Sequence, residues 1–410
     1  MDMTAIRAQF PAVTQHLEGK PVYFFDGPGG AQVPISVLNA MTDYLKKGNA
    51  NLGGRFFSGY QTDKVMGDAR VTAARFLNAP SENNIVFGAN MTSLSFSLSR
   101  AISRDWQKGD EVIVSALDHY SNVSSWEHAA KDKGVVVKKA RVNPDGCTID
   151  LEHLKSLLSG KTKLVAFTLA SNVTGTLVDA KSIIQAAKSV GAVTFIDAVH
   201  YAPHNLVDVQ HLECDFLLCS AYKFYGPHLG IAFVSEPWLT ELIPYKVEPA
   251  TDIGPGRFET GTQSFEALAG FVETVDYLAS LSGFGEEEPL RDRLELSFQK
   301  IAQHEERLSE RFLRWVETKS HIKLYGLTDS NHHIRTPTFA FTVSKMHPSD
   351  VAVSLGQKNM CVWAGHFYAQ GLIEQLGLMD FGGVVRVGFM HYNTLDEVDA
   401  LCMELDTFIS

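Results

Sequence analysis

The sequence has few cysteines and no long apolar run. Its 410 residues include five cysteines, an odd number, and none of them forms a Cys-x-x-Cys pair. This number and spacing of cysteines do not indicate a set of disulfide bonds. We therefore expect a reducing, cytoplasmic location in which most of the thiols are buried. No apolar stretch approaches the length of a membrane span. The residues from Met1 to Pro11 lack the basic start and apolar core of a signal peptide, so export is not expected.

Basic residues are in the minority. The chain has 36 Lys and Arg against 47 Asp and Glu, a net charge of −11 at pH 7, and no long basic run. Nucleic acids and anionic membranes both favour clustered Lys and Arg, so neither is expected as the main partner. Hydrophobic residues make up 45% of the chain and charged residues 20%, the balance of a globular protein with a substantial core.

Between about residues 80 and 235, short apolar runs alternate with amphipathic segments such as Leu151–Leu158 and Ala180–Val190. This alternation indicates an α/β fold with a mostly parallel sheet that is buried on both faces. Ligands of such sheets bind beyond the carboxyl ends of the strands. The seven expected strands are Asn84–Phe87, Glu111–Ser115, Val135–Val142, Lys163–Leu169, Val193–Ile196, Phe216–Cys219 and Gly230–Val234.

After about residue 265 the pattern changes to that of a smaller α+β domain. The expected elements are a long helix at Leu290–Thr318, strands at Thr336–Val343 and Val384–Met390, and a final helix from Thr394. A short helix at Thr4–Phe10 is expected to pack on this part. We therefore expect a large domain over residues 21–270 and a small domain over residues 271–410, joined by the segment 1–20.

Lys223 comes just after an apolar strand and precedes a Gly-Pro turn, where such a sheet meets its ligand. Its apolar and aromatic neighbours would desolvate the ammonium group and favour the neutral amine, which Schiff-base formation requires. A single lysine in a turn is ordinarily a solvated charge. The interpretation therefore depends on the residues at the ends of the neighbouring strands.

Polar residues stand after four of those strands. Asp197 could keep a cofactor's pyridine nitrogen protonated, although helix caps are a common role for such an Asp. His119 could stack on a ring, and Asn172 could donate to a carboxylate or ring oxygen; ordinary turn residues are the alternative for both. Asn90–Ser93 opens a helix, so its free N–H groups could receive a phosphate. Their joint placement at successive strand ends predicts a cofactor site.

No metal site is expected. His200 and His204 have the spacing of zinc ligands on a helix, but Pro203 lies between them and no Glu comes directly after His200.

Eight short motifs succeed one another along nearly the whole chain. They are Ile6–Pro11, Tyr23–Asp26, Asp118–Asn122, Ser171–Thr176, Val207–Val209, Ser220–Lys223, Glu259–Thr262 and Val385–Val387. This ordered set resembles the class V aminotransferase family, in particular its cysteine desulfurase and selenocysteine lyase branch. The resemblance implies a fold-type I transferase with a seven-stranded sheet, a homodimer, and pyridoxal 5'-phosphate (PLP) as the cofactor.

The resemblance also implies roles around the cofactor ring. Lys223 would form the Schiff base and later act as the base at the substrate α-carbon. Asp197 would pair with the pyridine nitrogen, and His119 would stack on the ring and assist proton transfer. His200 stands where the family usually has Gln, near the ring oxygen.

Further roles concern the phosphate and the substrate. Residues implied to bind the phosphate are Met91, Thr92, Ser220 and Tyr222, together with Thr262 from the second subunit. Arg386 would bind the substrate carboxylate with Asn172 beside it, a task that suits a planar guanidinium group.

One loop departs from the resemblance. Desulfurases of this type carry a catalytic cysteine after a Gly-His pair, but Gly365–His366 places Tyr368 at that position. Cys361 lies seven residues earlier, within or beside an expected strand, and is interpreted as a structural thiol. The glycines at Gly29–Gly30 and Gly53–Gly54 replace bulkier residues, which predicts a larger pocket.

The leading hypothesis is a PLP-dependent enzyme that cleaves a carbon–sulfur or carbon–selenium bond of a small amino acid. Without a persulfide-forming cysteine, direct β-elimination is the simpler chemistry. An aminotransferase, an epimerase or another lyase acting on a larger amino acid is the alternative. A non-catalytic PLP-binding protein is a third hypothesis, against which Lys223, Asp197 and Arg386 together count.

Overall fold

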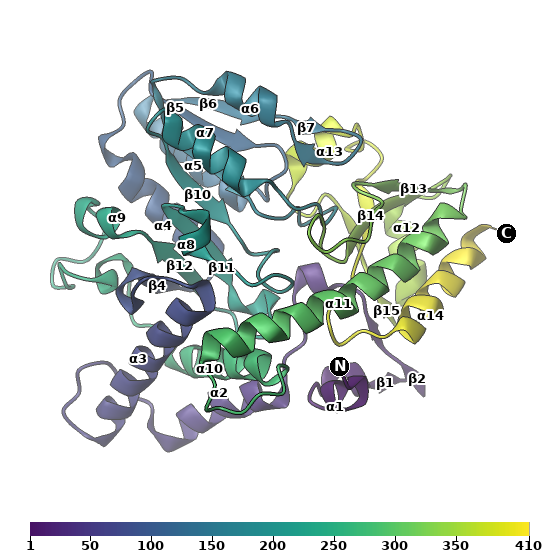
Figure 1. The fold of residues 1–410 in the computed structure, drawn as a ribbon, viewed down its shortest axis with the longest axis horizontal. Helices are drawn as coiled ribbons and strands as arrows, with labels where there is room; N and C mark the ends of the chain where they lie inside the picture. The colour runs from purple at the N-terminus through teal and green to yellow at the C-terminus, as the bar shows by residue number, and fades with distance from the viewer. Residues whose placement is uncertain (410) are drawn as a thin grey trace.

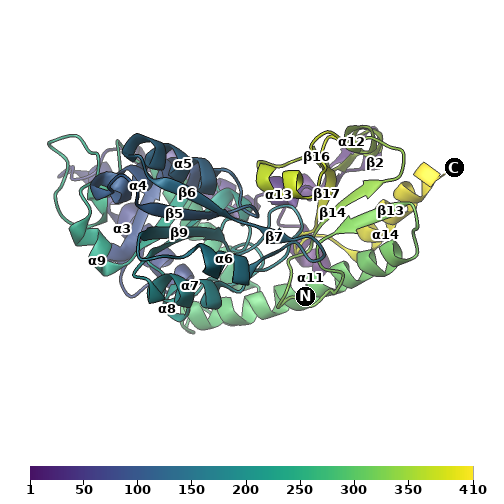
Figure 2. The same ribbon diagram turned by 90° about the horizontal axis from the view of Figure 1, so that it is seen from above.

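The computed structural model describes residues 1–409 and contains two main sheets. In Figure 1 the chain passes from the larger sheet to the smaller one through the long helix α11 (Leu290–Glu317). Figure 2 shows α11 running along one side of both parts. Within the described residues, no helix has the length and apolar character that a membrane crossing requires. The division into domains near residues 20 and 270 stays a prediction.

The larger sheet has seven strands in the order β4-β12-β11-β10-β9-β5-β6. Within it only β12 runs antiparallel to its neighbours, so the expected mostly parallel sheet is confirmed. The strands are β4 (Ile85–Gly88), β5 (Glu111–Ser115), β6 (Val136–Ala140), β9 (Thr162–Thr168), β10 (Val193–Asp197), β11 (Phe216–Ser220) and β12 (Gly230–Val234).

Helices cover both faces of this sheet. Figure 2 shows α4 (Met91–Ile102) and α5 (Ser121–Lys133) on one face, with α6 (Leu151–Leu157) and α7 (Ala180–Ser189) on the other. Successive strand residues contribute to two different core clusters; for example, Val112 and Val114 pack on one side and Ile113 on the other. Burial on both faces is why most of these strands are continuous apolar runs instead of alternating ones. The exception is the partly exposed edge strand β6, which contains Lys138 and Lys139.

Three expected strands differ from the structure by more than one residue at an end, and the one expected at Val384–Met390 ends at Gly388. The expected strand Val135–Val142 breaks at Arg141, after which Val142–Asn143 (β7) pairs with Thr148–Ile149 (β8) instead of the large sheet. Arg141 bonds through Nε to Asp150, which holds the chain in this hairpin. The strand expected from Thr336 begins at Thr338 (β14, Thr338–Val343), because Pro337 has no N–H group to donate to a ladder.

The smaller sheet is antiparallel, in the order β13-β14-β17-β16. It comprises β13 (Ile322–Tyr325), β14, β17 (Val384–Gly388) and β16 (Trp363–Gly365), and it packs on α11, α12 (Pro348–Gly356) and α14 (Leu395–Asp406). The short strands β13 and β16 were not expected from the sequence. A separate pair, β3 (Tyr23–Phe24) with β15 (Met360–Cys361), attaches the N-terminal segment here.

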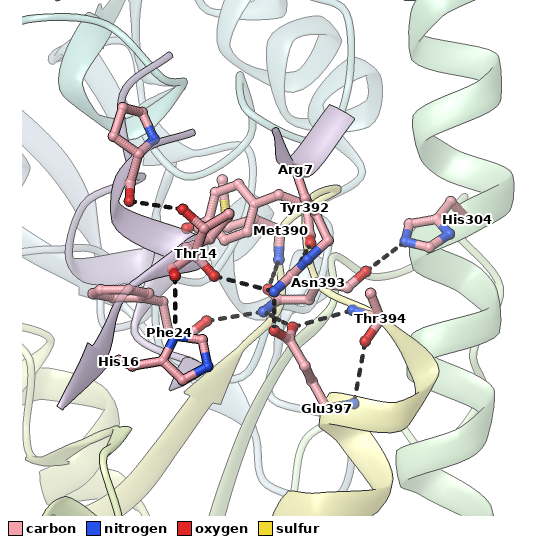
Figure 3. A network of polar contacts seen from close by, with 12 residues as sticks. Arg7, Thr14, His16, Phe24, His304, Met390, Tyr392, Asn393, Thr394 and Glu397 are labelled. Carbon is pink, nitrogen blue, oxygen red and sulfur yellow. Dashed lines mark hydrogen bonds and ion pairs between the residues drawn. The ribbon is translucent and has the colours of Figure 1, made fainter. Parts of the chain in front are cut away.

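A polar network ties the first helix to the last one (Figure 3). Arg7, in α1 (Met3–Arg7), donates to the Tyr392 carbonyl oxygen at 2.7 Å and pairs with Glu397 at 2.8 Å. Asn393 donates from Nδ2 to Glu397 at 2.8 Å and to the Phe24 carbonyl oxygen at 3.1 Å. The network therefore joins α1, β3 and α14, and β3 leads directly into the segment beside the candidate site.

Candidate active site

A cavity of about 440 Å³ opens at the carboxyl ends of β5, β9, β10 and β11. The sequence predicts a ligand site at this edge of the sheet. Nine of the predicted site residues line the cavity: Met91, Thr92, His119, Asn172, Asp197, His200, Ser220, Tyr222 and Lys223.

Lys223 lies just after β11, in the short turn of 3-10 helix Ala221–Lys223. Its Nζ donates to the Pro28 carbonyl oxygen and lies 4.8 Å from the centre of the Tyr222 ring. Burial, reinforced by the positive charge of Arg386, lowers the pKa of Lys223 from 10.5 to about 7. A large fraction of the side chain is therefore a neutral amine at neutral pH, as its apolar neighbours in the sequence predict.

Asp197 ends β10 and is buried. Its Oδ1 accepts from the Val199 N–H at 2.8 Å, while Oδ2 has no partner among the described residues and is not sealed from the cavity. Burial raises the pKa of Asp197 to about 6. One carboxylate oxygen is thus free to meet a cationic group in the cavity.

Asp118 is a second buried acid beneath the cavity, and sequence reasoning gave it no role. It accepts from Ser115 and, at 2.7 Å, from Asn122 Nδ2. Burial, together with the negative charge of Asp197, raises the pKa of Asp118 to about 8. The only indication of a role for Asp118 in the sequence is that this residue begins the motif Asp118–Asn122.

His119 lies shortly after β5 and is held by a local turn. Its Nδ1 accepts from the Ser121 N–H at 3.1 Å, which leaves the ring hydrogen on Nε2 in the neutral form. Burial, together with the charges of Lys223 and Arg386, lowers the pKa of His119 to about 4. A neutral, buried imidazole at the cavity wall is suited to stack on a flat ligand, and its centre lies 5.3 Å from that of Tyr368.

The first turn of α4 borders the cavity at another side. Asn90 caps this helix by accepting from the Ser93 N–H at 2.9 Å, and the Met91 N–H donates to Ser220 Oγ at 2.9 Å. The early N–H groups of a 12-residue helix have no helical acceptor and attract anions. His228, which was not predicted, also lines the cavity and stacks on Tyr222 at 4.9 Å.

Arg386 does not line the cavity itself but lies behind Asn172. Its Nη1 donates to the Asn172 carbonyl oxygen at 2.8 Å, and its guanidinium carbon is 4.1 Å from the centre of the Phe367 ring. Burial lowers the pKa of Arg386 to about 9, so the side chain stays charged at neutral pH. Asn172 Oδ1 is buried and has no partner among the described residues.

Asp26 is a further residue that sequence reasoning missed. Its Oδ1 is buried without a partner among the described residues, and its negative charge acts on both Arg386 and Lys223. Burial raises the pKa of Asp26. Its position at the end of the motif Tyr23–Asp26 was the only sequence signal.

Thr262 is not brought to the cavity of its own chain. It lines a separate hollow of about 680 Å³ together with Arg70, Tyr245 and Val247. This placement leaves its expected contact with the second subunit untested.

No cysteine lines the cavity within residues 1–409. Cys361 lies in β15, and burial raises the pKa of its thiol to about 11, which keeps the thiol protonated and weakly nucleophilic. Tyr368, by contrast, is 68% exposed near the cavity mouth. It adopts a left-handed backbone conformation with φ of 57°, as does Phe367 at 51°.

The residues present fit PLP. The cavity combines a partly neutral lysine, a carboxylate with a free oxygen, a neutral imidazole on its wall and a helix start for a phosphate. The unpartnered Asn172 Oδ1 and the charged Arg386 behind it mark where polar groups of a ligand would be satisfied.

Comparison with known proteins agrees with this fit of the cavity residues to PLP. The family model for class V aminotransferases matches residues 23–401. The chain is 34% identical to aminotransferase-like protein FGM3 of Gibberella zeae over 98% of this chain and 97% of that protein. It is 30% identical to a probable cysteine desulfurase of Halalkalibacterium halodurans over 99% and 98% of the two chains. A cysteine desulfurase of Thermococcus onnurineus superimposes with a TM-score of 0.87 at 24% identity, over 99% of this chain and 97% of that one. The chain therefore belongs to the class V aminotransferase family and is a PLP-dependent enzyme.

Proposed function

We propose that this enzyme cleaves the carbon–sulfur or carbon–selenium bond of a small amino acid related to cysteine. The observation that carries the proposal is that Lys223, Asp197 and Asn172 line one cavity, with Arg386 directly behind Asn172. The 30% identity to a probable cysteine desulfurase over nearly the whole chain supports it. Bound PLP supplies an electron-accepting ring that stabilises negative charge at the substrate's α-carbon.

The side chains have separate tasks in this proposal. Arg386 binds the substrate carboxylate, and the Asn172 amide orients it. Asp197 keeps the pyridine nitrogen protonated through its free oxygen. Lys223 removes the α-proton, a role for which a pKa of about 7 is well matched to neutral pH.

The fate of the sulfur distinguishes two versions of this reaction. The absence of a cysteine from the cavity wall over residues 1–409, and the protonated thiol of Cys361, favour direct release of sulfide. For cysteine, β-elimination yields sulfide, pyruvate and ammonia. Transfer of the sulfur atom to a nucleophile leaves alanine instead.

The test is a product assay on purified holoenzyme with cysteine, selenocysteine and their analogues. Pyruvate formed together with sulfide or selenide supports elimination, and alanine formed only with an added thiol supports sulfur transfer. A Lys223→Ala variant should form neither. If no cysteine-like substrate gives either product in the wild type, the proposed reaction is wrong.

A second candidate is an aminotransferase, an epimerase or another lyase acting on a larger amino acid. It is favoured by the 34% identity to an aminotransferase-like protein over 98% of this chain. The larger pocket predicted from Gly29 and Gly30 is not supported, because a Cβ on Gly29 would lie 3.2 Å from Trp363 Nε1 and one on Gly30 would lie 3.4 Å from Tyr222, so neighbouring side chains already fill this space. A spectral screen of the holoenzyme against all amino acids tests this candidate; cofactor left in the amine form after one turnover indicates transamination.

We also propose a homodimer in which Thr262 reaches the phosphate site of the second subunit. Thr262 borders a hollow outside its own cavity, beside an exposed apolar loop. On that loop Tyr245 is 57% exposed, Val247 72% and Ile253 81%. Side chains this apolar and this exposed are typical of a surface that another chain covers.

A cytoplasmic location agrees with the five unpaired cysteines.

A further inference from the structure

Tyr368 presents an aromatic ring beside the mouth of the cavity. The centre of the ring lies 5.3 Å from that of His119, which lines the cavity, and 68% of the side chain is exposed. A single exposed aromatic residue is common on protein surfaces, so the exposure alone assigns no role. The way in which the chain holds this ring is what distinguishes it.

The backbone of Tyr368 is fixed on both sides. Its N–H donates to His366 Nδ1 at 3.1 Å, and its carbonyl oxygen accepts from the Tyr120 N–H at 2.7 Å. The next residue, Ala369, is fully buried. The φ of 57° at Tyr368 is unfavourable for a residue with a side chain. Such strain persists only where the surrounding structure imposes it, and it is concentrated at ligand sites.

Tyr368 stands between two parts of the site that the proposed reaction uses. The preceding residue, Phe367, contacts the groups proposed to bind the substrate carboxylate. Its carbonyl oxygen accepts from Asn172 at 2.9 Å, and its ring centre lies 4.1 Å from the guanidinium carbon of Arg386. The Tyr368 ring lies against His119, the residue expected to stack on the cofactor ring. An amino acid that bridges these two parts has its side chain beside Tyr368.

The same place lacks a thiol that would accept sulfur. Among residues 1–409 no cysteine borders the cavity, so the sulfur of a substrate leaves together with any substituent that it carries. A flat apolar substituent gains both apolar contact area and ring stacking against a tyrosine, which a bare thiol does not. An aromatic substituent also spreads the negative charge of the departing thiolate, which makes it a better leaving group.

We propose that Tyr368 is a specificity-determining residue whose ring contacts the substituent on the substrate sulfur, so that the preferred substrates are S-substituted cysteines with a flat apolar substituent. This inference rests on the proposed carbon–sulfur cleavage and names its substrate class. The Cα–H and Cβ–S bonds break: Lys223 takes the α-proton, and the sulfur leaves with the bonding pair as a thiolate. Water converts the remaining three-carbon fragment to pyruvate and ammonia, so no oxidant or reductant is needed.

The experiment uses the holoenzyme and two pairs of compounds. S-phenylcysteine and S-methylcysteine are the substrates, and the release of thiol and pyruvate gives kcat/KM for each. In 2-amino-4-phenylbutanoate and 2-aminopentanoate a CH2 group replaces the sulfur of these two substrates. Neither analogue has a carbon–sulfur bond to cleave, so the change of cofactor absorbance on titration gives a dissociation constant for each.

Three variants separate the ring from other effects. Tyr368→Phe keeps the ring and removes the hydroxyl, and Tyr368→Leu removes the ring but keeps an apolar side chain. Phe284→Leu is the matched control, because Phe284 is also an exposed aromatic residue, at 53%, and lies outside the cavity lining.

In the wild type we expect kcat/KM for S-phenylcysteine to exceed that for S-methylcysteine by about tenfold or more. Tyr368→Leu should reduce this preference by about three- to tenfold, and the preference for the phenyl analogue in binding should fall with it. Tyr368→Phe and Phe284→Leu should keep both preferences.

The possible failures are distinguishable. A wild type that shows no preference for the phenyl compounds, in cleavage or in binding, overturns the inference, and thiol release in that case leaves carbon–sulfur cleavage standing. A Tyr368→Leu protein that keeps both preferences also overturns it. If the phenyl preference in binding depends on Tyr368 but no cysteine derivative gives thiol, the ring contact is upheld and the proposed reaction is wrong. Light scattering provides a last check: a changed mass of Tyr368→Leu in solution assigns the ring to a subunit contact and contradicts the proposal.

Discussion

Asn172 donates a 2.9 Å hydrogen bond from Nδ2 to the carbonyl oxygen of Phe367. The Phe367 ring in turn lies against Arg386, at 4.1 Å. Phe367 and Tyr368 both have positive φ angles, a conformation that costs energy in residues other than glycine. These contacts hold the strained loop in place, so the groups proposed to bind the carboxylate also support the cavity mouth.

Asn172→Ala should therefore weaken substrate binding by two routes, through the lost amide and through a loosened loop. We expect KM for the amino-acid substrate to rise by about tenfold or more, with a smaller change in cofactor absorbance. Steady-state kinetics on the substrate found in the product assay measure this. Asn143→Ala, an exposed position on β7, is the control. An unchanged KM in Asn172→Ala would contradict the role of the Asn172 side chain.

The pKa of about 7 for Lys223 predicts how cofactor binding depends on pH. The neutral amine is the reactive form, and its fraction increases as pH rises through the pKa. The rate at which PLP reconstitutes the cofactor-free protein should rise up to about pH 8 and then level off, whereas a lysine of ordinary pKa would give a rise to about pH 10 and above. Stopped-flow absorbance measures this rate directly.

Arg386 offers a check on that profile. Its positive charge helps to lower the pKa of Lys223, so Arg386→Gln should move the midpoint of the profile to higher pH. A midpoint that stays fixed or falls would show that this charge does not act on the lysine.

The cysteine arrangement predicts opposite results for two substitutions. Cys361→Ser should retain wild-type activity within about twofold, because a thiol with a pKa of about 11 is protonated at neutral pH. Tyr368→Cys places a thiol on the exposed loop near the cavity, and it should shift the products from pyruvate towards alanine when a thiol acceptor is added. Product analysis of both variants measures the activity and the ratio of pyruvate to alanine. If Cys361→Ser is inactive, the Cys361 thiol takes part in catalysis and this prediction is wrong.

Much of this architecture could be predicted from local sequence. All strands of the large sheet except the edge strand β6 are largely buried on both faces and form apolar runs, and the residue after such a strand lies at the ligand edge. Lys223, Asp197 and His119 were predicted as site residues by this rule, and all three line the cavity. Arg386 and Thr262 were predicted by resemblance alone, and neither lines the cavity of this chain.

Contacts between distant segments left no such signal. Thr336 meets His200 across 136 residues, and Phe367 meets Asn172 across 195. Nothing in the sequence near either position marks the pairing. The strand break at Arg141 was missed because the apolar pattern does not indicate that the last residues of the run pair outside the large sheet.

The proposed dimer predicts that a charge on the exposed apolar loop will separate the subunits. Val247→Glu should shift the mass in solution from two chains to one and weaken cofactor binding by about tenfold, through loss of the second subunit's Thr262. Light scattering and cofactor titration measure the two effects. Lys64→Glu, an exposed residue of α3 (Phe57–Leu77), controls for the change of charge alone. A wild-type protein that is monomeric at micromolar concentration would contradict the proposal.

The network around Asn393 predicts a strong effect on stability. Asn393→Leu leaves the Phe24 carbonyl oxygen and the Met390 N–H without their partner in a nearly inaccessible position. The free energy of unfolding should fall by about 2–4 kcal/mol. Chemical denaturation of the cofactor-free protein measures the loss. Asn331→Leu, at a more accessible asparagine outside this network, should cost less than about 1 kcal/mol.

The contact between Arg7 and Glu397 also sets an order of events during synthesis. The first helix is made long before its ion-pair partner, because Glu397 follows Arg7 by 390 positions (397 − 7). The large sheet is complete at residue 234, long before Arg386 and the segment 390–397 exist. A growing chain can thus form the floor of the cofactor site while its N-terminal segment waits unpaired. The contact can form only after residue 397 has been made, so a chain that stops before Arg386 lacks both the proposed carboxylate-binding residue and the ion-pair partner of the first helix.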